Sequence, residues 1–194
     1  MADWWGELSI GLFLLFSSAL VTGILMAIRA MEHDFSMNKL ELRQVILSQL
    51  QSKLEIAVSS AQRAIESATD EETVPEHKYD TLALEASYLA HGQAMRVQEC
   101  EQEIQALTNL VLPQEPQAVG LGCLVSLLDV EDDRHWFFLS PCAGGLKVEF
   151  QQHVIVLVTF DSPLGQALKT KQVEDEISYR IGDIEHSYEI ETIC

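Results

Sequence analysis

The chain has 194 residues, 47% of them hydrophobic, and a formal net charge of −18 at pH 7. That length is sufficient for one or two small domains with cores of their own. The acidic balance repels phosphate backbones, so it argues against direct binding of free DNA or RNA. A basic protein surface or a divalent cation is the more compatible partner.

No histidine or cysteine stands at zinc-ligand spacing from another ligand, and the sequence contains no phosphate-binding loop, HExxH motif or local Ser/His/Asp signature. We therefore expect no enzyme active site of its own. The cysteines are scattered, which is typical of reduced and partly buried thiols in a cytosolic domain. They are Cys100, Cys123, Cys142 and Cys194.

Residues 8–28 form a run without a single charge. As a helix such a run is about 31 Å long, close to the hydrocarbon thickness of a bilayer. Arg29 and Lys39 follow the run and no basic residue precedes it, so the positive-inside rule places the N-terminus outside and the rest of the chain in the cytoplasm. We predict that residues 1–36 are a transmembrane anchor in the inner (cytoplasmic) membrane.

A second interpretation of the same segment starts translation at Met37, where the soluble pattern MNKLEL begins. Residues 1–36 would then be absent from the working protein, which would be cytosolic. The sequence leaves both interpretations open.

Residues 37–112 carry apolar positions at alternating spacings of three and four, with one interruption. Pro75, inside the interruption, cannot continue a helix, and a short polar connection favours an antiparallel helix pair. We predict a coiled-coil hairpin with arms of about 45 Å. The expected seam positions are Leu47, Leu50, Leu54, Ala57, Ala61, Ala64 and Ala68, then Leu82, Ala86, Leu89, Cys100, Ile104, Leu107 and Val111, with Gln93 as a polar interruption.

Carboxylates gather at the predicted tip of this hairpin: Asp70, Glu71, Glu72 and Glu76. Clustered carboxylates are suitable ligands for Mg²⁺, a hard cation that prefers oxygen. A solvated acidic turn without any ligand is the alternative, because loops are polar and charges often collect there.

A linker at residues 113–118 separates the hairpin from a strand-rich domain over residues 119–194. Strands are expected at 122–130, 134–139, 146–150, 154–159, 176–180 and 187–193. One short helix is expected at residues 162–168, with Ser162 as its cap and Pro163 at its first position. The fold class is α+β, with a small antiparallel sheet on one helix. Alternation along 136–138 (Trp-Phe-Phe) places at least one ring outward.

The stretch VIVLVTFDSPLGQAL over residues 154–168, followed by KTKQVEDE over 169–176, resembles the strand, SPLGxAL helix and following segment of the GreA/GreB transcription elongation factors. A hairpin ahead of this domain is also the family order, so the resemblance covers residues 38–194. Three features differ: the tip reads DEETVP in place of the family motif, residues 170–175 lack the family glycines, and a transmembrane segment is not part of the pattern.

The resemblance implies an FKBP-like C-terminal domain that docks at the rim of the RNA polymerase secondary channel. The coiled coil would enter the channel, and Asp70, Glu71, Glu72 and, less strongly, Glu76 would help hold a Mg²⁺ shared with the polymerase. Polymerase contact is expected from the loop and helix start at Asp161, Ser162, Pro163 and Leu164.

Two other functions remain as alternatives. One is a membrane-tethered interaction adaptor without effect on transcript cleavage, since fold alone does not determine function. The other, prolyl isomerase activity, is suggested only by the FKBP-like fold and lacks a convincing aromatic pocket in the sequence.

Overall fold

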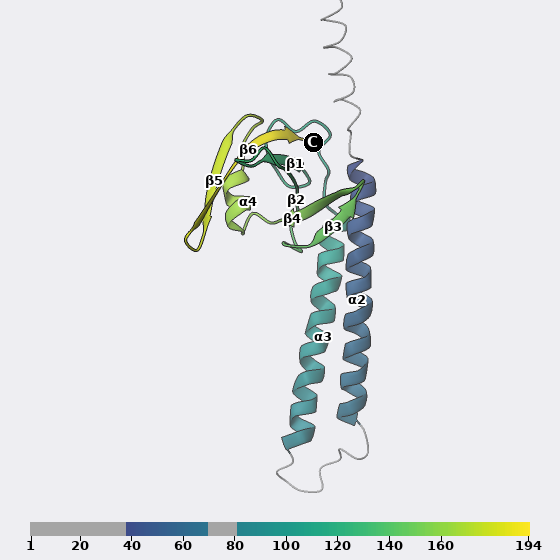
Figure 1. The fold of residues 1–194 in the computed structure, drawn as a ribbon. Helices are drawn as coiled ribbons and strands as arrows, with labels where there is room; N and C mark the ends of the chain where they lie inside the picture. The colour runs from purple at the N-terminus through teal and green to yellow at the C-terminus, as the bar shows by residue number, and fades with distance from the viewer. Residues whose placement is uncertain (1–37, 70–80) are drawn as a thin grey trace, which may run out of the picture. The chain divides into compact units, whose positions relative to one another are not determined.

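The computed structural model describes residues 38–69 and 81–194, which belong to one unit, Asn38–Cys194. Two long helices, α2 (Lys39–Thr69) and α3 (Thr81–Thr108), precede six strands and one short helix, α4 (Pro163–Leu168) (Figure 1). The predicted transmembrane run at residues 8–28 lies outside the described residues. Within residues 38–69 and 81–194 no helix is long and apolar enough to cross a membrane.

The helices α2 and α3 lie side by side as an antiparallel hairpin, as predicted (Figure 1). Asn38 caps α2: its Oδ1 accepts from the backbone N–H of Leu40 at 3.1 Å, and its Nδ2 donates to Glu41 Oε1 at 3.0 Å. Arg43, near the start of α2, donates to the carbonyl of Leu110, just beyond the end of α3, at 3.3 Å. Because this contact joins the start of α2 to the end of α3, the two helices run antiparallel.

The seam of the hairpin differs in part from the predicted one. Leu47 was predicted to lie in the seam but is only half-buried, and the residue before it, Ile46, is fully buried instead. Leu89 was also expected in the seam but is 57% exposed. Val111 lies beyond the end of α3 and is exposed. One series of less exposed positions of α3 keeps an uninterrupted spacing of four and three, with Glu103 and Ala106 half-buried beside it: Ala86, Ala90, Gln93, Val97, Cys100, Ile104 and Leu107. The α3 side of the seam therefore follows the heptad period, and small or polar residues are accepted where the period requires them. On α2 the first buried residues, Leu42, Ile46 and Leu50, are instead four residues apart.

The strands are β1 (Leu124–Leu128), β2 (Arg134–Leu139), β3 (Lys147–Phe150), β4 (His153–Val158), β5 (Glu176–Ile181) and β6 (Ile184–Ile193). They form one sheet in the order β3-β4-β2-β1-β6-β5. All six predicted strands are present; β2 has the predicted bounds, and the other five have one or both ends shifted. The predicted all-antiparallel sheet is wrong, because β2 and β4 pair in parallel, with Trp136 beside Ile155. The β3–β4 hairpin folds back so that β4, the later strand, lies against β2.

Both faces of the sheet are covered over much of their area. On one face α4 contributes Leu164 and Leu168 to a core that includes Val125, Leu139 and Ile190. On the opposite face Phe138 is fully buried and Trp136 nearly so, and α2 contacts β3. Phe137 points to the α4 side and is half-buried. No ring of the Trp-Phe-Phe run is therefore fully exposed, contrary to the expectation of an outward aromatic.

Candidate partner-binding site

The loop between β4 and α4 is held by a network around Ser162. The Ser162 side chain donates to the carbonyl of Thr159 at 2.7 Å and accepts from the backbone N–H of Gly165 at 3.1 Å. Its backbone is extended (φ −78°, ψ 154°), and Pro163 occupies the first turn, where a missing N–H costs nothing. The predicted cap is confirmed, and the network gives the loop a defined conformation.

Gly165 allows α4 to approach the end of β4 closely. A β-carbon at this position would lie 2.0 Å from the carbonyl oxygen of Thr159 and 2.7 Å from its carbon. Both neighbours are backbone atoms, which cannot rotate away. The glycine of the SPLG motif is thus explained by packing inside this chain.

The four residues predicted to contact a partner differ in exposure. Asp161 and Pro163 are exposed, Ser162 is half-buried, and Leu164 is 8% exposed within the core beneath α4. The structure therefore brings Asp161, Ser162 and Pro163 together at one surface loop. Leu164 faces the sheet and anchors that loop from below.

The predicted acidic tip residues, Asp70, Glu71, Glu72 and Glu76, lie outside the described residues. Within residues 38–69 and 81–194, no group of three or more His, Cys, Asp or Glu side chains is placed to hold a metal ion. A Mg²⁺ site at the tip therefore remains a prediction from the sequence.

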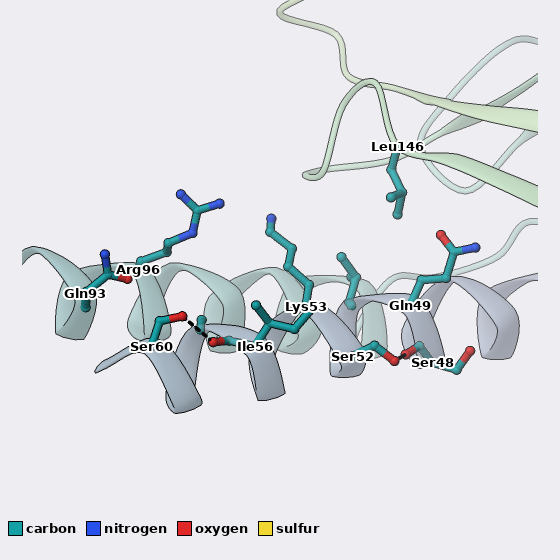
Figure 2. A pocket seen from close by; sticks show the side chains of 11 residues that line it. Ser48, Gln49, Ser52, Lys53, Ile56, Ser60, Gln93, Arg96 and Leu146 are labelled. Carbon is teal, nitrogen blue, oxygen red and sulfur yellow. Dashed lines mark hydrogen bonds between the residues drawn. The ribbon is translucent and has the colours of Figure 1, made fainter. Parts of the chain in front are cut away.

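A groove of about 680 Å³ runs along the hairpin beside Leu146, the residue before β3. Figure 2 shows Lys53 and Arg96 projecting to the side from which Leu146 enters. Lys53 pairs with Glu103 of α3 at 2.7 Å. Hydroxyl groups on α2 line the floor, but they are bonded to helix carbonyls, as Ser60 is to Ile56 at 2.8 Å. The groove is therefore lined by Arg96, by Lys53 with its charge paired, and by apolar surface from Ile56 and Leu146.

The cysteines are free and poorly placed for nucleophilic chemistry. Cys100 and Cys123 are buried, while Cys142 and Cys194 are partly buried. Burial raises the pKa of Cys123, Cys142 and Cys194, so these thiols stay protonated near neutral pH. Cys142 instead has a structural contact, because its Sγ lies 3.4 Å from the carbonyl oxygen of Glu103 on α3.

Sequence reasoning missed a polar and aromatic row on the α4 face. His135 Nε2 lies 2.8 Å from Asp129 Oδ2, and this hydrogen bond is the main cause that lowers the pKa of Asp129. The His135 ring contacts Tyr188 edge-on at 5.8 Å, and Tyr188 stacks on Tyr179 at 6.1 Å. Burial, followed by the neighbouring Tyr188, raises the pKa of Tyr179 to about 12. The sequence signals only the alternation of side chains within each strand. It does not signal this row, because the three side chains come from three different strands, β2, β6 and β5.

Comparison with known proteins gives a coarse likeness. No protein-family model matches the chain, and no curated protein is significantly similar to it. A structure of the transcription factor Gfh1 is similar at 20% identity, covering 77% of this chain and 93% of that one, with a TM-score of 0.33. GreA factor homolog 1 (Gfh1) of Thermus thermophilus is 22% identical, with coverages of 79% and 93% and a TM-score of 0.32. Gfh1 of Thermus aquaticus is 20% identical, with coverages of 79% and 92% and a TM-score of 0.33.

Likenesses at this level of identity and superposition carry no functional argument. Any proposal about function must therefore be argued from this chain's own sequence, from the order of its elements and from the geometry of the loop before α4.

Proposed function

We propose that this protein binds RNA polymerase and regulates transcription elongation, with its hairpin in the secondary channel and its C-terminal domain at the channel rim. The observation that carries the proposal is the loop before α4. Its SPLGQAL sequence resembles that of GreA/GreB factors, and Ser162 holds Asp161 and Pro163 at the surface. A hairpin of 31-residue and 28-residue helices precedes this domain, which is the order of elements in the family that the sequence resembles.

The length of the hairpin suits this role. At 1.5 Å per residue, the 31 residues of α2 extend about 46 Å from the base of the hairpin. Ala57, Ala61 and Ala64 form the seam of the distal half, where small side chains let two helices approach closely. A slender arm of this kind fits a narrow channel.

The tip carboxylates supply the finer part of the proposal. Asp70, Glu71 and Glu72 would present oxygen ligands to a Mg²⁺ shared with the polymerase, where the metal activates water and neutralises developing charge. The reacting groups then belong to the polymerase, and this chain contributes ligands and position.

Binding is tested with core RNA polymerase and the fragment 37–194, which includes the whole described unit. We expect co-purification of the fragment, and loss of most binding for the double variant Asp161→Ala, Pro163→Ala. Glu174→Ala, another exposed position of the same domain, is the matched control and should bind normally. A fragment that fails to bind polymerase excludes the proposal.

The role of the tip is tested separately by cleavage of backtracked transcripts. The variant Asp70→Asn, Glu71→Gln, Glu72→Gln should bind polymerase as the original does but alter the rate of transcript cleavage. Its control is Glu99→Gln, Glu101→Gln, which removes charge from exposed positions on the α3 shaft. Equal rates for both variants and the original chain would exclude the tip while leaving polymerase binding intact.

The uncharged run at residues 8–28 favours a second candidate, a membrane-tethered adaptor without effect on transcript cleavage. N-terminal mass spectrometry of the native protein distinguishes Met1 from Met37. Membrane fractionation then separates the candidates: the adaptor function predicts stable membrane residence without associated polymerase.

A further inference from the structure

Strand β5 forms one edge of the sheet, and among residues 38–69 and 81–194 its one neighbouring strand is β6. Its pairing with β6 runs without a register shift from Glu176 opposite Glu189 to Ile181 opposite Ile184. The sequence EISYRI contains neither proline nor lysine, two residues that commonly protect sheet edges. The edge is therefore a regular strand open to further pairing.

The hydrogen-bonding groups that face away from β6 follow from the turn. Ile181 and Ile184 flank a two-residue turn, and such a turn closes with a hydrogen-bonded pair. Hydrogen-bonded pairs then alternate along the ladder, and the bond from the N–H of Ile190 to the carbonyl of Asp175, at 3.0 Å, fits the same alternation. Glu176, Ser178 and Arg180 are thus the residues whose N–H and C=O point outward.

The charges on this edge are self-complementary. Glu176 and Arg180 lie symmetrically about Ser178, on the same face of the strand and both exposed. If two β5 strands pair antiparallel about Ser178, Glu176 lies opposite Arg180 of the partner subunit in a hydrogen-bonded pair, twice over. Registers centred on Glu176 or on Arg180 place like charges opposite each other, which is destabilising.

Glu176 also lacks charge compensation from its own neighbour. Its partner in the ladder is Glu189, another exposed carboxylate, and like charges directly opposite are unfavourable. Arg180 lies 3.7 Å from Glu185, and both side chains are mostly exposed, so that ion pair contributes little. A second β5 edge would supply the missing cation to Glu176 without breaking any buried contact.

We propose that two copies of this chain associate through their β5 strands, antiparallel and centred on Ser178, so that their two sheets become one. The occupant of the edge is a second copy because an identical strand, paired about Ser178, provides the matching arrangement of charge. The net charge of −18 per chain opposes association at low salt. At physiological ionic strength the Debye length is about 8 Å, which screens that repulsion but leaves the contact pairs. A single strand pair is a small interface, so the dimer is weak and concentration-dependent.

The test is analytical ultracentrifugation of the full 194-residue chain in detergent at physiological salt. We expect a concentration-dependent dimer whose dissociation constant rises about tenfold or more for Glu176→Arg and for Arg180→Glu, since each places like charges opposite twice. The double variant Glu176→Arg, Arg180→Glu restores the opposite-charge pairs and should restore dimerisation. Glu149→Arg on the other edge strand makes the same change of net charge as Glu176→Arg, so it is the matched control for that variant and should leave the dimer intact.

Misfolding does not explain the loss for Glu176→Arg, because arginine at position 176 would face Glu189 within its own chain and favour the β5–β6 hairpin. Arg180→Glu instead faces Glu185, so circular dichroism must show that this variant keeps its fold before its dissociation constant is compared. A wild-type chain that stays monomeric up to its solubility limit overturns the proposal. So does a double variant that dissociates as readily as either single variant.

A cross-link tests the register directly. Opposing residues of a hydrogen-bonded antiparallel pair have Cα atoms about 5.5 Å apart, within the range that a disulfide spans. Ser178→Cys should therefore give a disulfide-linked dimer under oxidising conditions. Ser187→Cys, its exposed neighbour on β6, is the control, and the wild-type chain measures the background from the native cysteines. Equal cross-linking of the two variants excludes the Ser178-centred register.

Discussion

The carbonyl oxygen of Thr159 lies 2.0 Å from the point where a β-carbon of residue 165 would sit, so Gly165 is the residue that lets α4 close onto the end of β4. The contact holds the loop that carries Asp161 and Pro163. The surface proposed for polymerase binding therefore depends on a packing detail beneath it.

Gly165→Ala should destabilise the protein by about 1–3 kcal/mol, because the methyl group forces a backbone shift in a packed region. Urea unfolding followed by circular dichroism measures the change. Gly120→Ala is the matched control, since a β-carbon there meets nothing within 4 Å and should alter the midpoint little. Equal midpoints for the two variants would contradict the close approach of α4.

Gly92→Ala should stabilise the hairpin by about 0.4–1 kcal/mol. Gly92 lies in the interior of α3, and a β-carbon there also meets nothing within 4 Å. Alanine therefore removes the entropic cost of a helical glycine without a clash. The check is a higher midpoint of urea unfolding, and a lower one would show that residue 92 needs the freedom of glycine.

Replacing Ser162 and replacing Asp161 should have different consequences for stability. Ser162→Ala removes the helix cap and should cost about 1 kcal/mol. Asp161→Ala changes an exposed side chain and should stay within about 0.5 kcal/mol. Thermal unfolding of both variants measures the difference. If Asp161→Ala proves as destabilising as Ser162→Ala, binding defects at this loop cannot be separated from folding defects.

Leu107→Ala should lower the free energy of unfolding by about 2–5 kcal/mol, because Leu107 is fully buried near the C-terminal end of α3. Leu89→Ala should change stability by less than about 0.5 kcal/mol, since Leu89 is largely exposed. This pair of variants tests the observed seam against the one expected from sequence, in which both leucines are buried. Comparable losses in urea unfolding would favour the sequence-based seam.

The ionisation of Tyr179 should appear as a late step in an alkaline titration of tyrosinate absorbance. Its pKa is raised from the ordinary value of 10.0 to about 12, because the fold favours the neutral phenol. A raised pKa contributes stability that is fully present below pH 10 and is lost as the pH rises through about 12. Tyr179→Phe should remove the late step, and Tyr88→Phe, on the exposed side of α3, should leave it. A late step that survives in Tyr179→Phe would assign it to another tyrosine.

The local elements follow from short-range chemistry and could be predicted without a structure. The arms of the hairpin were visible in the apolar spacing on either side of Pro75. The short helix was visible in Ser162 and Pro163, because capping and φ restriction act within a few residues. The connection after residue 150 was expected from the strand ends, but its conformation was not: Gln151 and Gln152 both have positive φ, at 49° and 66°, without the glycine or asparagine that usually signals such a turn.

The candidate site was only partly predictable. Asp161, Ser162 and Pro163 do share one surface loop, but the burial of Leu164 depends on a core built from strands far away in sequence. The row of His135, Tyr188 and Tyr179 likewise needs β2, β6 and β5 to lie in one sheet, with β1 between β2 and β6.

The sequence by itself determined which segments are helices and strands, and where the short helix starts, because those choices rest on contacts between near neighbours. The tertiary structure alone decided that β4 lies parallel to β2, and that Ile46 in place of Leu47 enters the hairpin seam. Those outcomes depend on which distant surface a segment meets. Strand pairing and side-chain burial depend on both of the segments that meet. The spacing of residues within one segment shows which face is apolar but not which other segment covers it.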